Sequence, residues 1–148
     1  MIVQKTSVFP AKQETVFRKL QRLEMLQQVA WPYAAFEPED GTADMWTAGS
    51  TFRFRFRLWG VIPFGVHTIH IVRFEPDGIS SREGNMHVPV WNHDIILVGL
   101  DSEHTRYTDR VEIRAGWKTV FVWLWAKAFY NHRQRKWIRL LKKEKISA

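Results

Sequence analysis

The sequence contains no cysteine among its 148 residues. This absence excludes a disulfide framework, thiolate zinc sites, iron–sulfur ligation and a cysteine nucleophile, and it fits a reducing compartment. With 8 glycines and 6 prolines the chain is neither collagen-like nor of low complexity. It also has no Gly-x-Gly-x-x-Gly, Walker or Gly-x-Ser-x-Gly motif, so dinucleotide binding and classical serine hydrolysis have no support.

Long hydrophobic runs are missing as well. The most apolar stretch, Trp117 to Tyr130, is interrupted by Lys118 and Lys127 and is shorter than the roughly 20 residues that a membrane span requires. The N-terminal segment lacks the basic start, apolar middle and small-residue cleavage site of a secretory signal. We therefore predict a cytoplasmic protein.

Net positive charge is missing outside the C-terminal end. Residues 1 to 117 carry 13 Lys/Arg against 14 Asp/Glu and sum to −1, whereas residues 118 to 148 carry 9 Lys/Arg against one Glu and sum to +8, so the last segment holds the whole positive excess. An excess confined to one tail does not describe a DNA-binding surface, and we predict no DNA partner.

Apolar residues make up 45% of the chain and aromatic residues 14%, which is enough for a sizeable core. We predict a single domain, residues 1–148. An extended start ends at Phe9, a short helix follows Pro10, and a second short helix ends at Trp31-Pro32, because a proline disfavours helix at the residue before it. From Thr119 to about Lys143 the chain has no Gly or Pro and predicts one long amphipathic helix.

The middle of the chain has the period-two pattern of half-buried strands. Between residues 51 and 59, Phe52, Phe54, Phe56 and Leu58 alternate with three arginines. Short turns separate the predicted strands, which favours an antiparallel meander. These strands are Thr51–Trp59, Val66–Phe74, Ile79–Met86, Trp91–Leu100 and Thr105–Arg114.

One row of the long helix is apolar and faces the predicted core. Its members recur at spacings of four and three, with a single arginine among them. The row consists of Trp123, Ala126, Tyr130, Arg133, Trp137 and Leu140.

Several local stretches are similar to one known group of proteins. Val8-Phe9-Pro10-Ala11 precedes the first helix, Gly49-Ser50-Thr51 precedes a strand, and Trp91-x-His93 is followed by Thr105 and Asp109-x-Val111. In this order they resemble the START-like, or SRPBCC, superfamily, which includes Bet v 1-like allergens and polyketide cyclases and dehydrases. The resemblance implies an α+β helix-grip fold: a curved antiparallel sheet of about 6–7 strands wrapped around a long C-terminal helix, with two short helices after the first strand. It also implies a hydrophobic pocket.

Two polar residues fall on strand faces that are otherwise apolar. His93 shares a face with Trp91 and Ile95, and Asp109 shares one with Tyr107 and Val111. If both faces point inward, a carboxylate orients the imidazole, which then acts as a general base or as a polar anchor for a ligand. The alternative is that the two groups satisfy each other by hydrogen bonding and do no chemistry.

His67 and His70 are three residues apart on a predicted strand, so they point to opposite faces and do not share a metal ion. We predict no metal and no cofactor. The candidate catalytic residues are His93 and Asp109. The predicted ligand-binding residues are Phe54, Phe56, Trp59, Trp91, His93, Ile95, Tyr107, Asp109, Val111, Trp123, Tyr130 and Arg133.

Three functions fit these patterns. The leading hypothesis is that the protein binds or carries a hydrophobic small molecule, such as a lipid, polyketide, isoprenoid or quinone-like compound, between its sheet and its C-terminal helix. The second is a cyclase or dehydrase-type enzyme in which His93 is the base, Asp109 orients it, and Tyr107 or Arg133 polarises a carbonyl. The third is a regulatory module that docks weakly on an anionic membrane or a ribosome through the basic residues 132–145.

Overall fold

The protein folds as seven strands and three α-helices over residues 1–39 and 46–147, which are the residues that the computed structural model describes. A short 3₁₀ turn, η1, connects the last strand to the last helix. In chain order the elements are β1 (Ile2–Phe9), α1 (Gln13–Leu20), α2 (Leu23–Ala30), β2 (Ala34–Pro38), β3 (Thr51–Leu58), β4 (Ile62–Glu75), β5 (Gly78–Gly84), β6 (Val90–Gly99), β7 (Thr105–Arg114), η1 (Gly116–Lys118) and α3 (Thr119–Ser147).

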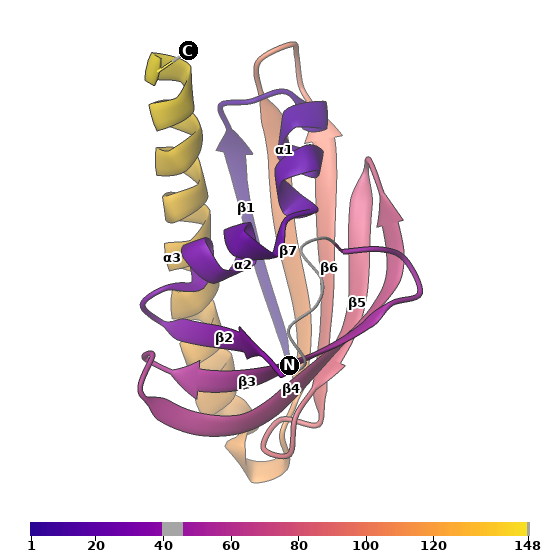
Figure 1. Cartoon of the computed structure of the whole chain (residues 1–148), viewed down its shortest axis with the longest axis vertical. Coiled ribbons are helices and arrows are strands. Elements are labelled where there is room, and N and C mark those ends of the chain that lie inside the picture. The colour runs from indigo at the N-terminus through magenta and orange to yellow at the C-terminus, as the bar shows by residue number, and fades with distance from the viewer. Residues whose placement is uncertain (40–45, 148) are drawn as a thin grey trace.

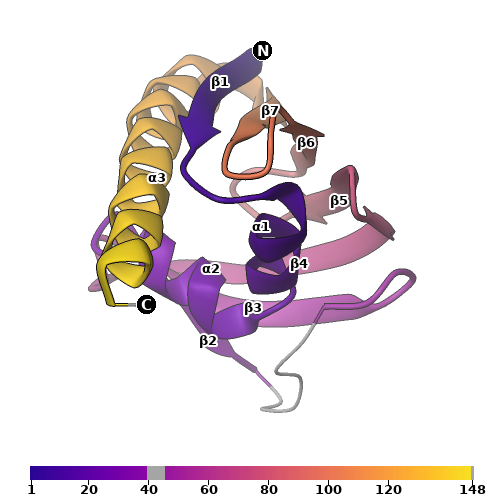
Figure 2. The ribbon, with the colours of Figure 1, turned by 90° about the horizontal axis from the view of Figure 1, so that it is seen from above.

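The strands form one antiparallel sheet in the order β1-β7-β6-β5-β4-β3-β2. This sheet curves around α3, which runs along its concave side (Figure 1). Figure 2 shows α1 and α2 at one end of the space between α3 and the sheet. The predicted α+β arrangement is therefore confirmed. Among the helices of the described residues, none has the length and apolar character to cross a membrane.

Strand β3 shows why the alternation in the sequence was informative. Phe54 and Phe56 are buried, whereas Arg53, Arg55 and Arg57 are exposed on the outer face. Two of these arginines reach acidic residues in or just after β2: Arg57 lies 3.6 Å from Glu37 of the strand, and Arg53 lies 3.5 Å from Glu39, which follows it. Exposed pairs of this kind contribute little to stability, and the burial of the phenylalanines holds the strand in place.

The buried face of α3 is broader than the predicted row. Ala126, Tyr130, Arg133 and Trp137 are buried as expected, but Trp123 and Leu140 are only partly covered. The helix also packs against α2 and β1, so its buried face extends sideways. The additional buried side chains are Phe129, Gln134 and Leu141.

Stacked aromatic rings fill the space near the far end of α3. The ring of Phe9, where β1 ends, lies 4.3 Å from the ring of Tyr107 and 5.7 Å from that of Trp137, measured between centroids. All three side chains are almost inaccessible to solvent. The stack closes this end of the helix–sheet interface, and Trp137 also lines the cavity described below.

Candidate functional site

A cavity of about 510 Å³ lies between the sheet and α3. This volume is in the range of sites for drug-sized molecules. Two of the residues that line it, Trp117 and Phe121, are 81% and 67% exposed, so the cavity reaches solvent beside the start of α3. Its walls are mostly apolar and rich in aromatic side chains, which include Phe36, Phe56, Phe64, Trp91, Trp125 and Phe129.

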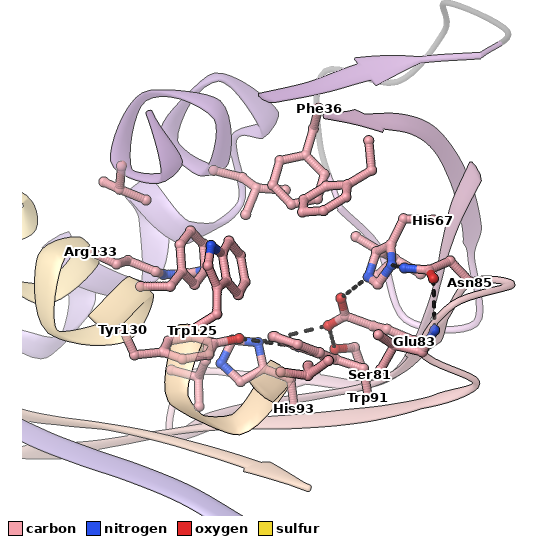
Figure 3. Close-up of a pocket in the computed structure, with 18 of the residues that line it drawn as sticks. Phe36, His67, Ser81, Glu83, Asn85, Trp91, His93, Trp125, Tyr130 and Arg133 are labelled. Carbon is pink, nitrogen blue, oxygen red and sulfur yellow. Dashed lines mark hydrogen bonds and ion pairs between the residues drawn. The ribbon is translucent and has the colours of Figure 1, made fainter. Parts of the chain in front are cut away.

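A small polar cluster interrupts these apolar walls (Figure 3). Its members come from four parts of the fold: β4, β5 with the turn that follows it, β6 and α3. The side chains are those of His67, Ser81, Glu83, Asn85, His93 and Arg133.

Glu83 lies at the centre of this polar cluster. Its Oε1 is 2.9 Å from Nε2 of His67, and its Oε2 accepts a hydrogen bond from the hydroxyl of Ser81. Nδ1 of His93 lies 3.8 Å from Oε2. Burial raises the pKa of Glu83, but the contacts with His67 and His93 outweigh it and hold the pKa well below its ordinary value. Glu83 is therefore a buried, ionised carboxylate.

The turn after β5 orients the ring of His67. Oδ1 of Asn85 accepts hydrogen bonds from the backbone N–H groups of His87 and Val88, at 2.8 and 2.9 Å. The amide nitrogen of Asn85 must therefore face His67, and it donates to Nδ1 at 3.2 Å. Because Nδ1 accepts, Nε2 is the ring nitrogen that donates to Glu83.

His93 has carboxylates on both sides. Nε2 lies 2.7 Å from Oδ1 of Asp109, and Nδ1 faces Glu83. Burial lowers the pKa of His93, but the contacts with Asp109 and Glu83 raise it above its ordinary value overall. The two flanking carboxylates thus favour the protonated form of His93 more than water does.

Asp109 is completely buried, and both of its oxygens have partners. Oδ1 accepts from His93 and from the hydroxyl of Tyr107 at 3.3 Å, and Oδ2 accepts from the amide of Gln134 at 3.0 Å. Burial raises its pKa, but the hydrogen bond from His93 and the charge of Arg133 lower it overall. The pairing of His93 with Asp109 follows from the register, in which Asp109 is opposite Ile95, two residues along β6 from His93.

Arg133 brings a guanidinium to the cavity wall from α3. It is 5% exposed, and its guanidinium carbon lies 5.8 Å from the ring centroid of Tyr130. Nη2 is 3.5 Å from the hydroxyl of Tyr107. Its Nε is buried and has no hydrogen-bond partner among the described residues. A guanidinium remains charged under these conditions.

The structure divides the predicted ligand-binding residues into three groups. The first group lines the cavity: Phe56, Trp91, His93, Ile95, Tyr130 and Arg133. The second group is buried but does not reach the cavity: Phe54, Tyr107, Asp109 and Val111. Phe54 packs instead in a separate cluster with Trp46 and Ile71.

Trp59 and Trp123 form the third group, which lies outside the cavity. Trp59 follows the end of β3 in a tight turn with φ of 55°, where strand alternation no longer applies, and it packs on Tyr33 at 48% exposure. Trp123 lies on the side of α3 that faces β1, and its indole N–H donates to the carbonyl of Ile2 at 2.8 Å.

Sequence reasoning missed Glu83, Ser81 and Asn85, and it considered His67 only as a metal ligand. Strand β5 reads Gly-Ile-Ser-Ser-Arg-Glu-Gly, in which both faces are polar, so alternation does not show which face is inside. Alternation places Glu83 on the same strand face as the apolar Ile79, and this shared face was the signal that could have predicted an inward Glu83. Among the described residues, no group of three or more His, Asp or Glu could hold a metal ion.

Comparisons with known proteins agree with this geometry at the level of the fold. The family model described as "Domain of unknown function (DUF8410)" matches residues 7–141. No curated protein resembles the chain closely enough to count as a relative.

Three solved structures illustrate the likeness. A START superfamily protein from Mycobacterium smegmatis has a TM-score of 0.74 at 16% identity, and the match covers 96% of this chain and 97% of that one. Protein MLL2253 from Mesorhizobium loti has a TM-score of 0.75 at 15% identity, with 97% and 98% covered. DynU16, a putative protein in the dynemicin biosynthetic locus, has a TM-score of 0.63 at 20% identity; 95% of this chain matches 47% of that chain. The predicted START-like fold is thus confirmed.

Proposed function

This chain belongs to the family described as a domain of unknown function (DUF8410), and from its cavity we propose that the protein binds or carries a hydrophobic small molecule between its sheet and α3. The observation that carries the proposal is a space of about 510 Å³ with apolar and aromatic walls. Filling such a space with apolar ligand atoms removes their surface from water, which is the main driving force for binding.

The chemistry of the walls narrows the ligand class. Flat side chains such as Trp91 and Trp125 suit a ring system or an isoprenoid chain, and the polar cluster around Glu83 gives a ligand with one polar group a place to pair it. Lipid, polyketide, isoprenoid and quinone-like molecules meet these conditions. The likeness to DynU16, described as a putative protein in the dynemicin biosynthetic locus, supports a biosynthetic small molecule as one of these classes.

Native mass spectrometry of the purified protein tests this proposal. We expect a reproducible added mass that is released on denaturation and that identifies the chemical class of the ligand. Tryptophan fluorescence should also respond to the matching compound, since Trp91 and Trp125 line the cavity. A clean apo mass, together with no fluorescence response to lipids, quinones and aromatic polyketides, would contradict the proposal.

The substitution Val122→Trp should block the cavity. Val122 lines the cavity from α3, and an indole there occupies volume that the ligand needs. We expect ligand binding to fall below detection in titration calorimetry, with a loss of stability of about 1–3 kcal/mol from overpacking. The matched control is Val120→Trp, because Val120 is on the same helix, is 51% exposed and does not line the cavity. Equal binding by the two variants would place the ligand elsewhere.

A second candidate function is a cyclase or dehydrase-type enzyme, which the 2.7 Å contact between His93 and Asp109 favours. Both nitrogens of His93 face carboxylates, so it suits the role of proton donor better than that of base. Turnover of an aromatic polyketide precursor that stops in His93→Ala, while that variant still binds the precursor, would establish this function.

The third candidate, docking through residues 132–145, depends on the exposed face of α3. Arg133 and Trp137 are buried, so Arg135, Arg139 and Lys142 supply positive charge to the surface. If this face docks, glutamate at these three positions should abolish salt-sensitive binding to phosphatidylglycerol vesicles or ribosomes in co-sedimentation. The same charge change at Arg53, Arg55 and Arg57 of β3 is the control. Binding that survives the α3 reversal would exclude this face.

A further inference from the structure

Arg133 presents hydrogen-bond donors to the cavity that the protein leaves almost unused. A guanidinium has five N–H groups, yet the described residues accept from Arg133 through a single long contact, 3.5 Å from Nη2 to the hydroxyl of Tyr107. Its Nε is buried without a partner. Figure 3 shows the side chain extending from α3 toward the cavity. Leaving buried donors without acceptors costs free energy, so the N–H groups of Arg133 are satisfied only when another molecule supplies an acceptor oxygen.

The nearby carboxylates are already engaged. Both oxygens of Asp109 accept hydrogen bonds from its own neighbours, and those of Glu83 accept from His67 and Ser81. Neither carboxylate lies within ion-pair distance of Arg133 in the described residues. The oxygen that accepts hydrogen bonds from the unused N–H groups of Arg133 must therefore belong to a molecule that enters the cavity.

The balance of buried charge indicates what kind of acceptor fits. Two carboxylates, Glu83 and Asp109, flank His93 on this side of the cavity, and the other cation of the lining, Lys118, lies at the open end beside the exposed Trp117. A carboxylate ligand at Arg133 would add a third negative charge near these two in a nonpolar space, whereas an uncharged oxygen adds none.

We propose that Arg133 binds an uncharged carbonyl oxygen of the hydrophobic ligand, so that the cavity selects ketones, esters or quinones over carboxylic acids and plain hydrocarbons. This inference rests on the proposed function and adds the polar group of the ligand to it. The apolar part of the ligand then lies against Trp91, Trp125 and Phe129, which line the same cavity.

Three probes of one size test the selection: 2-acetylnaphthalene, 2-ethylnaphthalene and 2-naphthoate, titrated calorimetrically into the full chain. We expect the ketone to bind about 10- to 100-fold more tightly than the hydrocarbon, as for a hydrogen bond from a charged donor. The carboxylate should bind more weakly than the ketone. In the infrared spectrum, the C=O stretch of the bound ketone should move to lower frequency.

The substitution Arg133→Met should remove the preference. The ketone should lose about 10- to 100-fold in affinity and its C=O shift, while the hydrocarbon keeps its affinity. The control is Lys127→Met, which removes a positive charge from the other side of the same helix, where the ammonium lies 4.4 Å from the ring centroid of Trp123. Circular dichroism verifies folding, and the preference and the infrared shift of the unaltered chain provide a test that needs no variant.

The outcomes separate this inference from the proposed function. Equal binding of ketone and hydrocarbon by the unaltered chain, or tighter binding of 2-naphthoate, overturns the role of Arg133 and leaves a hydrophobic pocket in place. An unshifted C=O stretch of the ketone bound to the unaltered chain also overturns the role of Arg133. If none of the probes binds while the chain is folded, the inference about Arg133 is wrong, and the native mass spectrum decides the proposed function separately.

Discussion

Replacing Asp109 with alanine should lower the free energy of unfolding by about 3–5 kcal/mol, the cost of breaking a buried ion pair from one side. Asp109 is fully buried and accepts hydrogen bonds from His93, Tyr107 and Gln134. Without it, His93 loses its 2.7 Å partner, and the other two donors lose their acceptor in a space from which water is excluded. Urea denaturation of the two proteins, with the slope compared, measures the difference.

Two further variants make this result specific. Asp94→Ala removes a carboxylate from the neighbouring strand β6, but Asp94 is partly exposed and lies 3.7 and 3.8 Å from Arg82 and Arg110, so its loss should cost less than about 1 kcal/mol. Asp109→Asn keeps the shape and one acceptor oxygen, and it should fall between the two. If Asp109→Ala costs no more than Asp94→Ala, Asp109 is not the structural anchor of the polar cluster.

Stability should also pass through a maximum in mildly acidic solution. The pKa values of Glu83 and Asp109 are lowered by folding, so their contribution is present above the unfolded values of about 4 and is lost as the pH falls through the folded values. The pKa of His93 is raised, so its contribution is present below the unfolded value of about 6.5 and is lost as the pH rises through the folded value. All three contributions coexist between about pH 5 and 6.

Urea denaturation from pH 3 to 9 measures this profile, in which one shifted group changes stability by up to about 1.4 kcal/mol per pH unit. The substitution Glu83→Gln should flatten the acid side of the profile, because a neutral amide cannot be protonated there. Replacing the exposed Glu24 of α2 with glutamine should leave the profile unchanged. An acid side that is equally steep in both variants would show that Glu83 is not ionised inside the fold.

The elements that the sequence predicted well are those with a regular pattern and a clear stop. Phe54 and Phe56 alternate with arginines, and the structure buries the former and exposes the latter. Helix α2 ends at Ala30, just before Trp31-Pro32, as the proline required. The C-terminal helix extends to Ser147, beyond the predicted end near Lys143, because no glycine or proline follows to stop it.

Turns were where alternation failed. Trp59 continues the β3 pattern in the sequence, but the chain leaves the strand at Leu58 and Trp59 takes a left-handed conformation. Strand β4 begins at Ile62 instead of Val66 and contains Pro63, which is tolerated because β5 pairs with β4 only from Thr68 onward. Periodicity describes the middle of an element, and local backbone geometry decides its ends.

The sequence predicted only part of the candidate site, because alternation places a polar residue only where its neighbours on the same strand face are apolar. His93 and Asp109 have such neighbours, so their inward position could be predicted, and the register of β6 and β7 brings the two together. Glu83 has few such neighbours on β5, and nothing in the sequence relates it to His67, which is 16 residues away on another strand. Its partners are set by the pairing of β4 with β5.

The sequence by itself determined the order of elements, the inward faces of the regular strands and the position of the long helix, because these follow from local spacing and from proline and glycine. The tertiary structure alone decided that strands β2 to β6 and the three helices enclose a cavity, that Glu83 lies between two histidines, and that Arg133 faces this cavity with unused hydrogen-bond donors. Burial and hydrogen bonding depend on which residues meet across the sheet and the helix. Spacing along the chain does not contain that information.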